Sequence, residues 1–562
     1  MEYGWRVVDI QQHARKLQMA STAVISFWKK HRQFWLPLTP AAKEEADAAI
    51  CAAFWGEYPW QEESIAGQAI YLDQFSRHFQ RAGRLPEEEV LAWRQRACAL
   101  LQERVEDLCG LDEVELTFAL MPFKHLEVWD FIFHIIHERW LPVRGVEGTE
   151  ATLLEFPTLQ RFYMDTYKKA YTLERVRAEL YDAGATAVAP QKSYDAALIC
   201  ESYPELYLDA DHWHLQALLY TIGDDPAFLT LKKHFIPLSN PRDVYVSLSG
   251  GVDSMVTLLI MKMAIEPMGS TVRAIHIIYG NRAESEDEAQ FITEYCRRLA
   301  VPLTLYRIPW LRRGQVDRAF YEEMTRQLRF WTYQAAPRGS AEKEPEVILG
   351  HIQDDVVENI WTNLATGTHL DNLKMMRSSC RQMGVRLLRP LLRVEKSTIL
   401  AAAKLFAVPY LKNTTPLWSN RGKFREHFHA ATIKQFGAGV DAKMVAFADA
   451  MERQAAIIHW AVYRPMYESW CADTGEVNIT PGVNALLDAT GWGQLFDHLC
   501  HEKLRVNKPS AKAVAELDRR MRIPYTAPIR VNMSGTLHVI VRWEEVTRTW
   551  WMKCVVAEKE GA

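Results

Sequence analysis

The segment VYVSLSGGVDSMVTLLI, residues 244–260, joins a short apolar run to a helix-compatible run through two adjacent glycines. Glycine lets the backbone turn sharply and approach a ligand closely. The amides that follow then point at an anion, helped by the positive end of the helix. The hydroxyls of Ser249 and Ser254 add donors, and the carboxylate of Asp253 can hold a magnesium ion. The pattern predicts a phosphate-binding turn, with a purely structural glycine turn as the alternative. It is not a Walker loop, because G-x-x-x-x-G-K-S/T is absent.

Strand-like and helix-like runs alternate after this turn. Residues 271–279, 303–309 and 347–350 have the apolar character of strands, and residues 286–300 that of a helix. This alternation favours βαβ units and a mostly parallel sheet with helices on both faces. The insert at residues 336–346 predicts a mobile surface loop.

An acidic segment, HIQDDVVEN, follows the run at 347–350 directly. His351, Asp354, Asp355 and Glu358 are spaced i, i+3, i+4 and i+7, so on a helix they share one face. Three carboxylates on one face repel one another, and they make sense when aimed at a cation or at substrate protons. Ligands bind at the carboxyl ends of parallel strands, which favours this interpretation over a solvated acidic face.

The flanking regions have different patterns. From about residue 8 to 235 apolar residues recur at helical spacing, with many tryptophans that we expect in the core. After residue 432 the chain is helical again, and the last runs predict a small antiparallel sheet. The predicted domains are an all-helical domain over 1–183, a linker with connecting helices over 184–241, an α/β domain over 242–431, and a helical plus small β region over 432–562.

Composition limits the class of protein. With 562 residues we expect two to four domains, and no apolar run is long enough to span a bilayer. We expect no secretory signal peptide and a cytoplasmic location, with an organelle as the alternative. The nine cysteines contain no CxxC pair, which excludes zinc ribbons and iron–sulfur sites of that spacing. A net charge of −4 means that any nucleic acid must bind a local patch, for which residues 511–522 are a candidate.

The hexapeptide at 249–254 is the SGGxDS signature, so the chain resembles the PP-loop ATP pyrophosphatases. This superfamily contains asparagine synthetases, GMP synthetases, tRNA thiolases and tRNA(Ile)-lysidine synthases. The resemblance implies a Rossmann-like domain of the adenine nucleotide alpha hydrolase type. It also implies that ATP is cleaved between its α and β phosphates, that an oxygen is adenylated, and that a nucleophile displaces AMP.

Further segments resemble the lysidine synthases in particular. HIQDDVVEN is similar to their HxxDDxxET motif, with Asn359 in place of threonine, and residues 279–285, 326–330 and 389–392 are similar to their HGLRxxS, ARxxRY and RPLL motifs. The resemblance covers residues 242–430. Two stretches depart from the family pattern, residues 366–373 and 413–428, which leaves the acceptor open.

The resemblance implies a tRNA-modifying ligase that uses ATP and Mg²⁺, with tRNA as partner and lysine or another amine or sulfur nucleophile. It implies catalytic roles for Asp253, Asp355, Glu358, Arg421 and Arg425, the two arginines being alternatives for polarising the base. It implies nucleotide binding by Ser249, Gly250, Gly251, Val252, Asp253, Ser254, Ile277, Arg282 and His351. It implies metal binding by Asp253, Asp354 and Asp355.

Three other functions remain as alternatives. A tRNA thiolase usually has paired cysteines or a catalytic cysteine near the site, an amidotransferase needs a glutaminase domain, and a non-catalytic ATP-binding scaffold has lost turnover. The front of the chain, at residues 72–77 and 121–127, resembles an uncharacterised all-helical bacterial family for which no activity is implied. There Asp73, Arg77, His125 and Glu127 form either a polar site or a buried structural network.

Overall fold

The computed structural model describes residues 23–35, 39–56, 58–145, 152–182, 243–281, 285–336, 344–367, 372–406, 408–411, 420–437, 439–479, 483, 487–525, 527–546 and 549–556. The chain divides into two compact units, residues 1–352 with 378–415 and residues 353–377 with 416–562. None of the helices in these ranges has both the length and the apolar character that crossing a bilayer requires.

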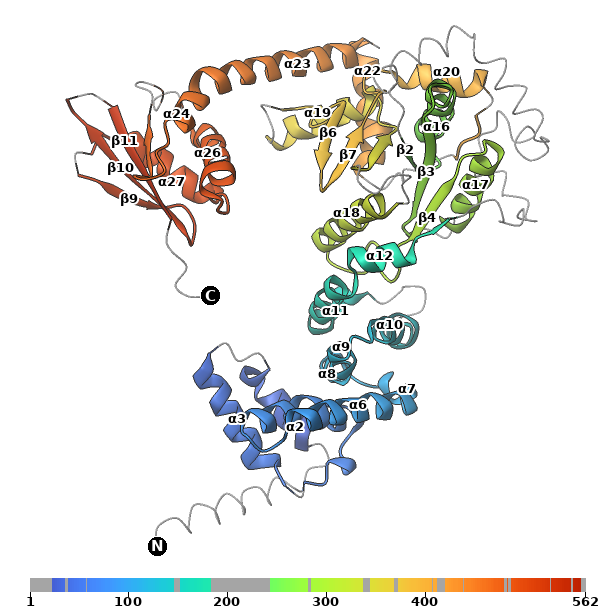
Figure 1. Ribbon diagram of the computed structural model, residues 1–562, viewed down its shortest axis with the longest axis vertical. Helices are drawn as coiled ribbons and strands as arrows, with labels where there is room; N and C mark the ends of the chain where they lie inside the picture. The colour runs from blue at the N-terminus through green and yellow to red at the C-terminus, as the bar shows by residue number, and fades with distance from the viewer. Residues whose placement is uncertain are drawn as a thin grey trace. The chain divides into compact units, whose positions relative to one another are not determined.

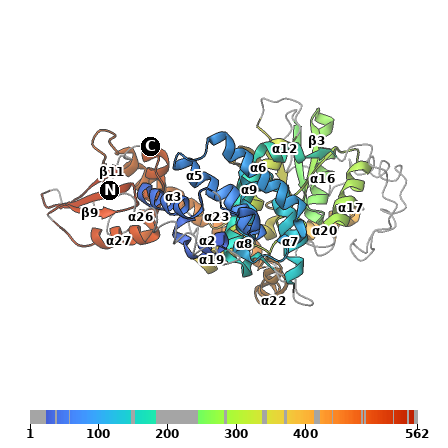
Figure 2. The same ribbon diagram turned by 90° about the horizontal axis from the view of Figure 1, so that it is seen from below.

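The first unit begins with short helices that pack on one another (Figures 1 and 2). They are α2 (Ala23–Lys30), α3 (Pro40–Phe54), α4 (Ile65–Ile70), α5 (Ser76–Arg81), α6 (Glu87–Glu103), α7 (Val105–Leu108), α8 (Glu113–Ala119), α9 (Met121–His125), α10 (Trp129–His134), α11 (Pro157–Ala170) and α12 (Leu173–Glu179). A π-helical turn, η3 (Tyr71–Phe75), joins α4 to α5, and a second, η4 (Ile135–Trp140), extends α10.

Aromatic side chains fill the core of these helices. Trp28 and Trp140 are fully buried, and the Trp28 ring lies 5.6 Å from Phe75 and 5.4 Å from Phe118 in edge-on contacts. Edge-on pairs are favoured because the positive ring edge meets the negative ring face. The tryptophan-rich stripe is core here, as expected, although Trp55 is 40% exposed.

A seven-stranded sheet follows, with strand order β1-β4-β3-β2-β5-β7-β6. Its strands are β1 (Tyr181–Asp182), β2 (Asp243–Leu248), β3 (Thr271–Ile278), β4 (Leu303–Arg307), β5 (Glu346–Leu349), β6 (Ser379–Gln382) and β7 (Val385–Leu388). The five inner strands are parallel, and the two edge strands β1 and β6 are antiparallel. Parallel strands are covered on both faces, which accounts for their nearly continuous apolar runs.

Helices cover both faces of this sheet. The side chains of Val244, Val246 and Leu248 share a core with α16 (Val252–Ile265), α17 (Ser285–Arg298) and α20 (Lys396–Leu405). Tyr245, on the opposite face, belongs to the core that contains α18 (Arg318–Ala335) and the N-terminal helices. Alternate residues of one strand therefore enter two different cores.

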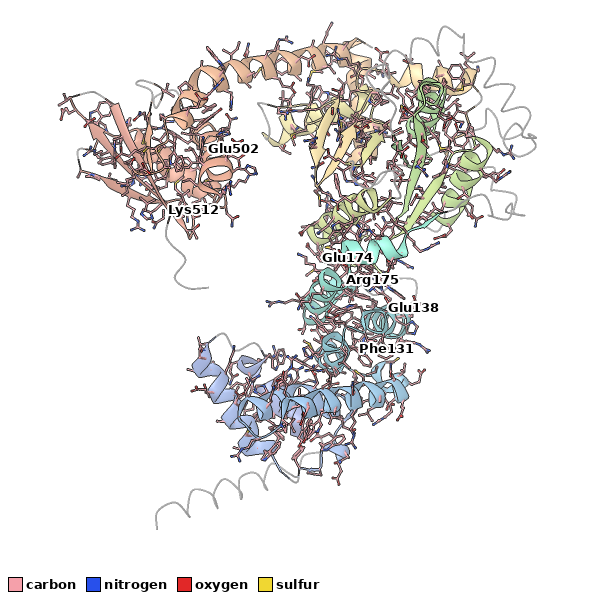
Figure 3. The ribbon with its side chains drawn as sticks, viewed as in Figure 1. Phe131, Glu138, Glu174, Arg175, Glu502 and Lys512 are labelled. Atoms are coloured by element: carbon pink, nitrogen blue, oxygen red, sulfur yellow. The ribbon has the colours of Figure 1, made fainter. Side chains whose placement is uncertain are left out.

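The helix α12 attaches the N-terminal helices to the sheet. It packs on α18, and the strand β1 that follows it pairs with β4. Arg175, labelled in Figure 3, stacks over the Tyr171 ring and donates to Asp130 of α10 at 2.6 Å. These contacts place the helices and the sheet in the same compact unit.

The second unit contains α19 (Gln353–Thr366), α21 (Asn420–Lys423), η9 (Phe424–His429), α22 (Ala430–Phe436), α23 (Val440–Ile458), α24 (Arg464–Glu468), α26 (Ala489–His498) and α27 (Ala511–Met521). Its four-stranded antiparallel sheet has the order β8-β11-β10-β9, formed by β8 (Glu476–Asn478), β9 (Ile529–Asn532), β10 (Leu537–Glu544) and β11 (Thr549–Val556). Trp492 and Leu517 of α26 and α27 share a core with Val539 of β10.

The expected fold class is confirmed: an all-helical front, a central α/β domain with a mostly parallel sheet, and an α+β C-terminal region. The four predicted central strands are present, and the sequence analysis missed β1, β6, β7 and β8. The domain boundaries stay predictions, because the proposed linker at 184–241 lies outside the described residues, as does most of the loop at 336–346.

Candidate active site

The phosphate-binding turn lies between β2 and α16, at the carboxyl end of the central strand. Gly250 has φ +78°, and a Cβ atom there would lie 2.5 Å from Cδ1 of Leu411. Any other residue at position 250 would therefore be strained by its backbone angle, and the end of the Leu411 side chain would have to shift. Gly251 has φ −72° and ψ 154°, an ordinary extended conformation, so only one of the two glycines is needed for its backbone angles.

A third glycine, which the sequence analysis missed, brings β5 against this turn. A Cβ atom at Gly350 would lie 3.0 Å from both Cα and N of Ser254. The end of β5 therefore approaches the first turn of α16 at backbone distance. The available signal was a glycine as the last residue of the predicted strand 347–350, because a glycine in a strand often marks close backbone approach.

The two serines hold the turn together. Ser254 is buried, and its Oγ donates to the carbonyl of Gly251 at 2.9 Å and accepts from the amide of Ser249 at 3.2 Å. Ser249 is exposed, with its Oγ 3.2 Å from that of Ser254. The amides of Ser254 and Met255 donate to the carbonyl of Gly251 at 3.1 Å. The amides at the very start of α16, at Val252 and Asp253, have no preceding helical turn to bond and can bind an anion. This donor set and the glycine geometry fit a bound phosphate chain.

Asp253 is in the first turn of α16, where the helix dipole favours a carboxylate. Nζ of Lys396 lies 2.8 Å from each of its carboxylate oxygens. The two residues are 143 positions apart, and Lys396 was not among the predicted site residues. The fold brings them together because α20 packs against α16.

The adenine side of the predicted site lies along β3. The last residue pair between β2 and β3 is Leu248 with His276. Ile277, the next residue of β3, therefore has no partner residue in β2. The side chain of Ile277 is buried in the core, which leaves its backbone as the feature that can recognise a base. Arg282, also predicted for this site, lies outside the described residues.

His276 stabilises the junction between β3 and the turn. Its Nδ1 bonds to the carbonyl of Leu248 at 2.9 Å. Burial is the main cause that lowers the pKa of His276 to about 4, so the ring is neutral at physiological pH. The loop after β3 is held by side chains: Asn281 donates to the hydroxyl of Tyr321 at 2.6 Å and accepts from the amide of Arg313 at 3.0 Å.

His351 lies at the end of β5, two residues before α19 begins at Gln353. It is therefore not on the helix that carries the neighbouring carboxylates. Nε of Arg389 donates to its Nδ1 at 3.1 Å, and Nη1 of Arg389 contacts Sγ of Cys380 at 3.3 Å. Arg389, the arginine of the RPLL segment, thus orients the imidazole of His351. Residue spacing alone does not reveal this pairing.

In the second unit, Asp355 and Glu358 of α19 are paired with both candidate arginines. Nη2 of Arg421 pairs with Asp355, and its Nε lies 3.1 Å from Glu358. Arg425 repeats the arrangement at 2.8 Å and 3.4 Å. Asp355 is 4% exposed, so its charge requires these partners. The sequence left the choice between the two arginines open, and the structure brings both to the same carboxylates.

The surroundings of Glu358 act on its pKa in opposite directions. Burial raises the pKa of this carboxyl, while Arg425 and His429 lower it, and burial prevails. The next residue, Asn359, donates to the carbonyl of Lys374 at 3.1 Å. Asparagine at this position therefore fixes the segment after α19, and it does so through an amide that threonine lacks.

The polar cluster of the N-terminal helices forms a closed network around Asp73. This buried carboxylate accepts from Nε of Arg94 at 2.7 Å and lies 2.8 Å from Nδ1 of His125. Glu127 is exposed. Both oxygens of Asp73 have partners, which fits a structural role.

Among the residues that the structure describes, no group of three or more His, Cys, Asp or Glu side chains is arranged to hold a metal ion. Asp253 belongs to one compact unit, and Asp354 and Asp355 belong to the other. The role of these three carboxylates as magnesium ligands stays a prediction.

Comparison with known proteins identifies the central part of the chain. Residues 227–421 match the family of PP-loop domains. A tRNA(Ile)-lysidine synthase of Chlamydia muridarum is 30% identical over 213 residues, which are 37% of this chain and 64% of that protein. That of Nitrosomonas europaea is 31% identical over 175 residues, 31% of this chain and 36% of the relative. The chain thus spans less than two thirds of the length of these relatives.

One solved structure is also similar, a U34-tRNA thiolase, NcsA, from Methanococcus maripaludis with its 4Fe–4S cluster. It is 16% identical, with a TM-score of 0.34, and the match covers 40% of this chain and 80% of that one. The central part of this chain is a PP-loop domain, and its sequence is similar to that of tRNA(Ile)-lysidine synthases.

Proposed function

Because residues 227–421 belong to the PP-loop domains, we propose that this chain is an ATP-dependent, AMP-forming ligase that modifies tRNA. In this proposal ATP adenylates the carbonyl oxygen of a wobble cytidine, and the amine of lysine displaces AMP. The observation that carries it is the turn at 249–254, in which Gly250 has φ +78° and the end of β5 at Gly350 lies at backbone distance from Ser254. The choice of tRNA as acceptor and of lysine as nucleophile is based on the similarity to relatives named tRNA(Ile)-lysidine synthase.

The proposed roles in the first unit concern the nucleotide. The leading amides of α16, at Val252 and Asp253, bind the phosphates, and the backbone at Ile277 receives the adenine. His351, oriented by Arg389, lies at the end of the neighbouring strand and contacts the nucleotide. Asp253 is proposed as a ligand of Mg²⁺, which when bound neutralises charge on the phosphate oxygens.

The proposed roles in the second unit concern the acceptor and the amine. One arginine of the pair Arg421 and Arg425 donates to the carbonyl oxygen of the base and stabilises its developing charge. Glu358 accepts the proton of the incoming amine, a task for which its raised pKa makes it a stronger base. Asp355 keeps the arginines in place, and with Asp354 it is proposed as a magnesium ligand.

The test measures release of AMP and pyrophosphate from ATP and Mg²⁺, with lysine and bulk tRNA added singly and together. We expect release that requires both tRNA and lysine, and its loss in Asp253→Ala. Release with tRNA but without lysine dependence would contradict lysine as the nucleophile. No AMP under any combination, from a folded protein that binds ATP, would contradict the ligase and favour the scaffold.

A sulfur-transferring enzyme on the same fold is the second candidate. The observation in its favour is Cys380, which contacts Arg389, the partner of His351. The variant Cys380→Ser separates the two functions. The lysine-dependent ligase keeps its AMP release in this variant, whereas a thiolase that uses this thiol loses formation of thiolated tRNA when sulfide replaces lysine.

A further inference from the structure

The positive charge of Lys396 does not stabilise the helix that carries it. It is the first residue of α20, after Glu395 at the N-cap. The positive end of the helix dipole disfavours a cation in the first turn, where carboxylates are favoured instead. The exposed Lys404, in the last turn of α20, has the favourable position. The reason for a lysine at position 396 therefore lies outside α20.

The ammonium of Lys396 reaches the phosphate-binding turn. It lies 2.8 Å from both oxygens of Asp253, which is in the first turn of α16. The two side chains are 32% and 22% exposed, so this ion pair borders solvent and is not sealed in the core. A lysine ammonium is a compact charge with three donors, which suits phosphate oxygens as well as carboxylates.

The ion pair and the proposed magnesium site compete for the same oxygens. A cation that binds Asp253 repels the ammonium, because two positive charges would then lie beside the same carboxylate. The ammonium then needs another acceptor within reach of its flexible stem. A phosphate chain on the first amides of α16 provides acceptors beside Asp253.

We propose that Lys396 is a phosphate-binding residue of the nucleotide site. Before nucleotide binds, Asp253 holds the ammonium beside the turn. When ATP and its magnesium bind, the ammonium moves to the β- or γ-phosphate oxygens and later neutralises the pyrophosphate that leaves. This inference rests on the proposed function, because it requires that the turn at 249–254 bind ATP.

The test compares nucleotide affinities by isothermal titration calorimetry on the full chain. The ligands are α,β-methylene-ATP, whose α–β bond cannot be cleaved, and AMP, which lacks the outer phosphates, each with Mg²⁺. The variants are Lys396→Met, which keeps the aliphatic stem, Lys396→Arg, which keeps the charge, and Lys404→Ala as the control on the same helix.

We expect Lys396→Met to weaken binding of α,β-methylene-ATP about tenfold or more, the effect of one hydrogen bond to a charged group. AMP affinity should stay within about twofold of the wild type, because AMP has no β-phosphate to lose a contact. Lys396→Arg should recover most of the affinity, and Lys404→Ala should leave both affinities unchanged.

Equal affinities in Lys396→Met and wild type would overturn the proposal, and so would a parallel loss for both ligands, since that indicates structural support of the turn. A wild-type chain that binds neither nucleotide would instead contradict the proposed function. If Lys396→Met does not fold, Lys396→Gln, which also removes the charge, takes its place. A selective loss of affinity for α,β-methylene-ATP supports the phosphate contact, and an unchanged affinity or a parallel loss overturns it.

Discussion

At the scale of single residues, Gly250 is the position of the turn that tolerates the least change. Alanine there combines a left-handed backbone, which costs about 1–2 kcal/mol in a residue with a Cβ atom, with displacement of the Leu411 side chain. We expect Gly250→Ala to lower the unfolding midpoint and to abolish binding of ATP. Gly83→Ala is the control, because Gly83 has φ +67° and nothing within 4 Å of the added atom. Equal effects of the two variants on stability would show that displacement of the Leu411 side chain costs nothing.

A second prediction at this scale concerns acid. Because the pKa of His276 is lowered to about 4 in the folded protein, the unfolded chain takes up the proton first as pH falls. The neutral His276 therefore contributes its full stabilisation above the ordinary pKa near 6.5. As pH falls from there to about 4, the free energy of unfolding decreases by about 3 kcal/mol. His276→Asn keeps a donor to Leu248 without titrating.

The measurement is the unfolding midpoint, in the full chain, of the unit that contains the seven-stranded sheet, at pH 7 and pH 4.5. We expect the wild type to lose more stability than His276→Asn between these two values. The remaining loss in the variant is that of the other titrating groups. An identical loss in both proteins would contradict the lowered pKa of His276 in the folded protein, because a histidine with the same pKa in the folded and unfolded chain adds no pH dependence.

At the scale of elements, a feature could be predicted from the sequence when the residues that form it are consecutive in the chain. The strand, turn and helix around Gly250 were predicted because each is written in consecutive residues. The hairpin of β6 and β7 was missed, since each strand has four residues and the first is polar. Arg389 and Lys396 were missed as site residues for another reason: their partners are 38 and 143 residues away, and packing of elements brings them together.

The pairing of α19 with the helix that begins at Asn420 gives the third prediction. Asp355 is buried and accepts from both Arg421 and Arg425, so either arginine alone can compensate its charge. We expect Arg421→Ala and Arg425→Ala to cost about 1 kcal/mol each, because both arginines are partly exposed and screened. The double variant leaves Asp355 unpaired and should cost about 3–5 kcal/mol, more than the sum.

Chemical unfolding of the two single variants and the double variant measures this coupling. Lys423→Ala is the control, because Lys423 is exposed on the same helix and its loss lowers the net positive charge of the segment equally. Additive costs would mean that each arginine acts on Asp355 independently. Catalysis gives a separate readout, since loss of AMP release in only one single variant identifies the arginine that polarises the base.

At the scale of the whole molecule, the N-terminal helices and the sheet form one core. Phe162 and Tyr167 belong to the same buried cluster as Tyr245, Ile275 and Val347 of the sheet. The hydroxyl of Tyr167 also donates to the carbonyl of Pro309 at 3.0 Å, in the loop after β4. The sequence predicted an all-helical domain over 1–183 with no stated role, and the bounds of that domain stay a prediction. Contacts with residues so far along the chain could not be predicted, because they depend on how the elements pack.

This shared core predicts that the central domain depends on the helices in front of it. A fragment that begins at residue 227, where the match to PP-loop domains begins, retains α18 but loses the aromatic side chains that cover the same face. Exposed apolar surface of this kind promotes association and loosens packing. We expect the fragment to bind a hydrophobic dye and to elute as aggregates in size-exclusion chromatography, whereas the full chain carrying Tyr167→Phe remains folded with a slightly lower midpoint. A monomeric fragment that unfolds cooperatively and binds ATP like the full chain would show that the helices are an independent domain, and would direct the search for their role away from the nucleotide site.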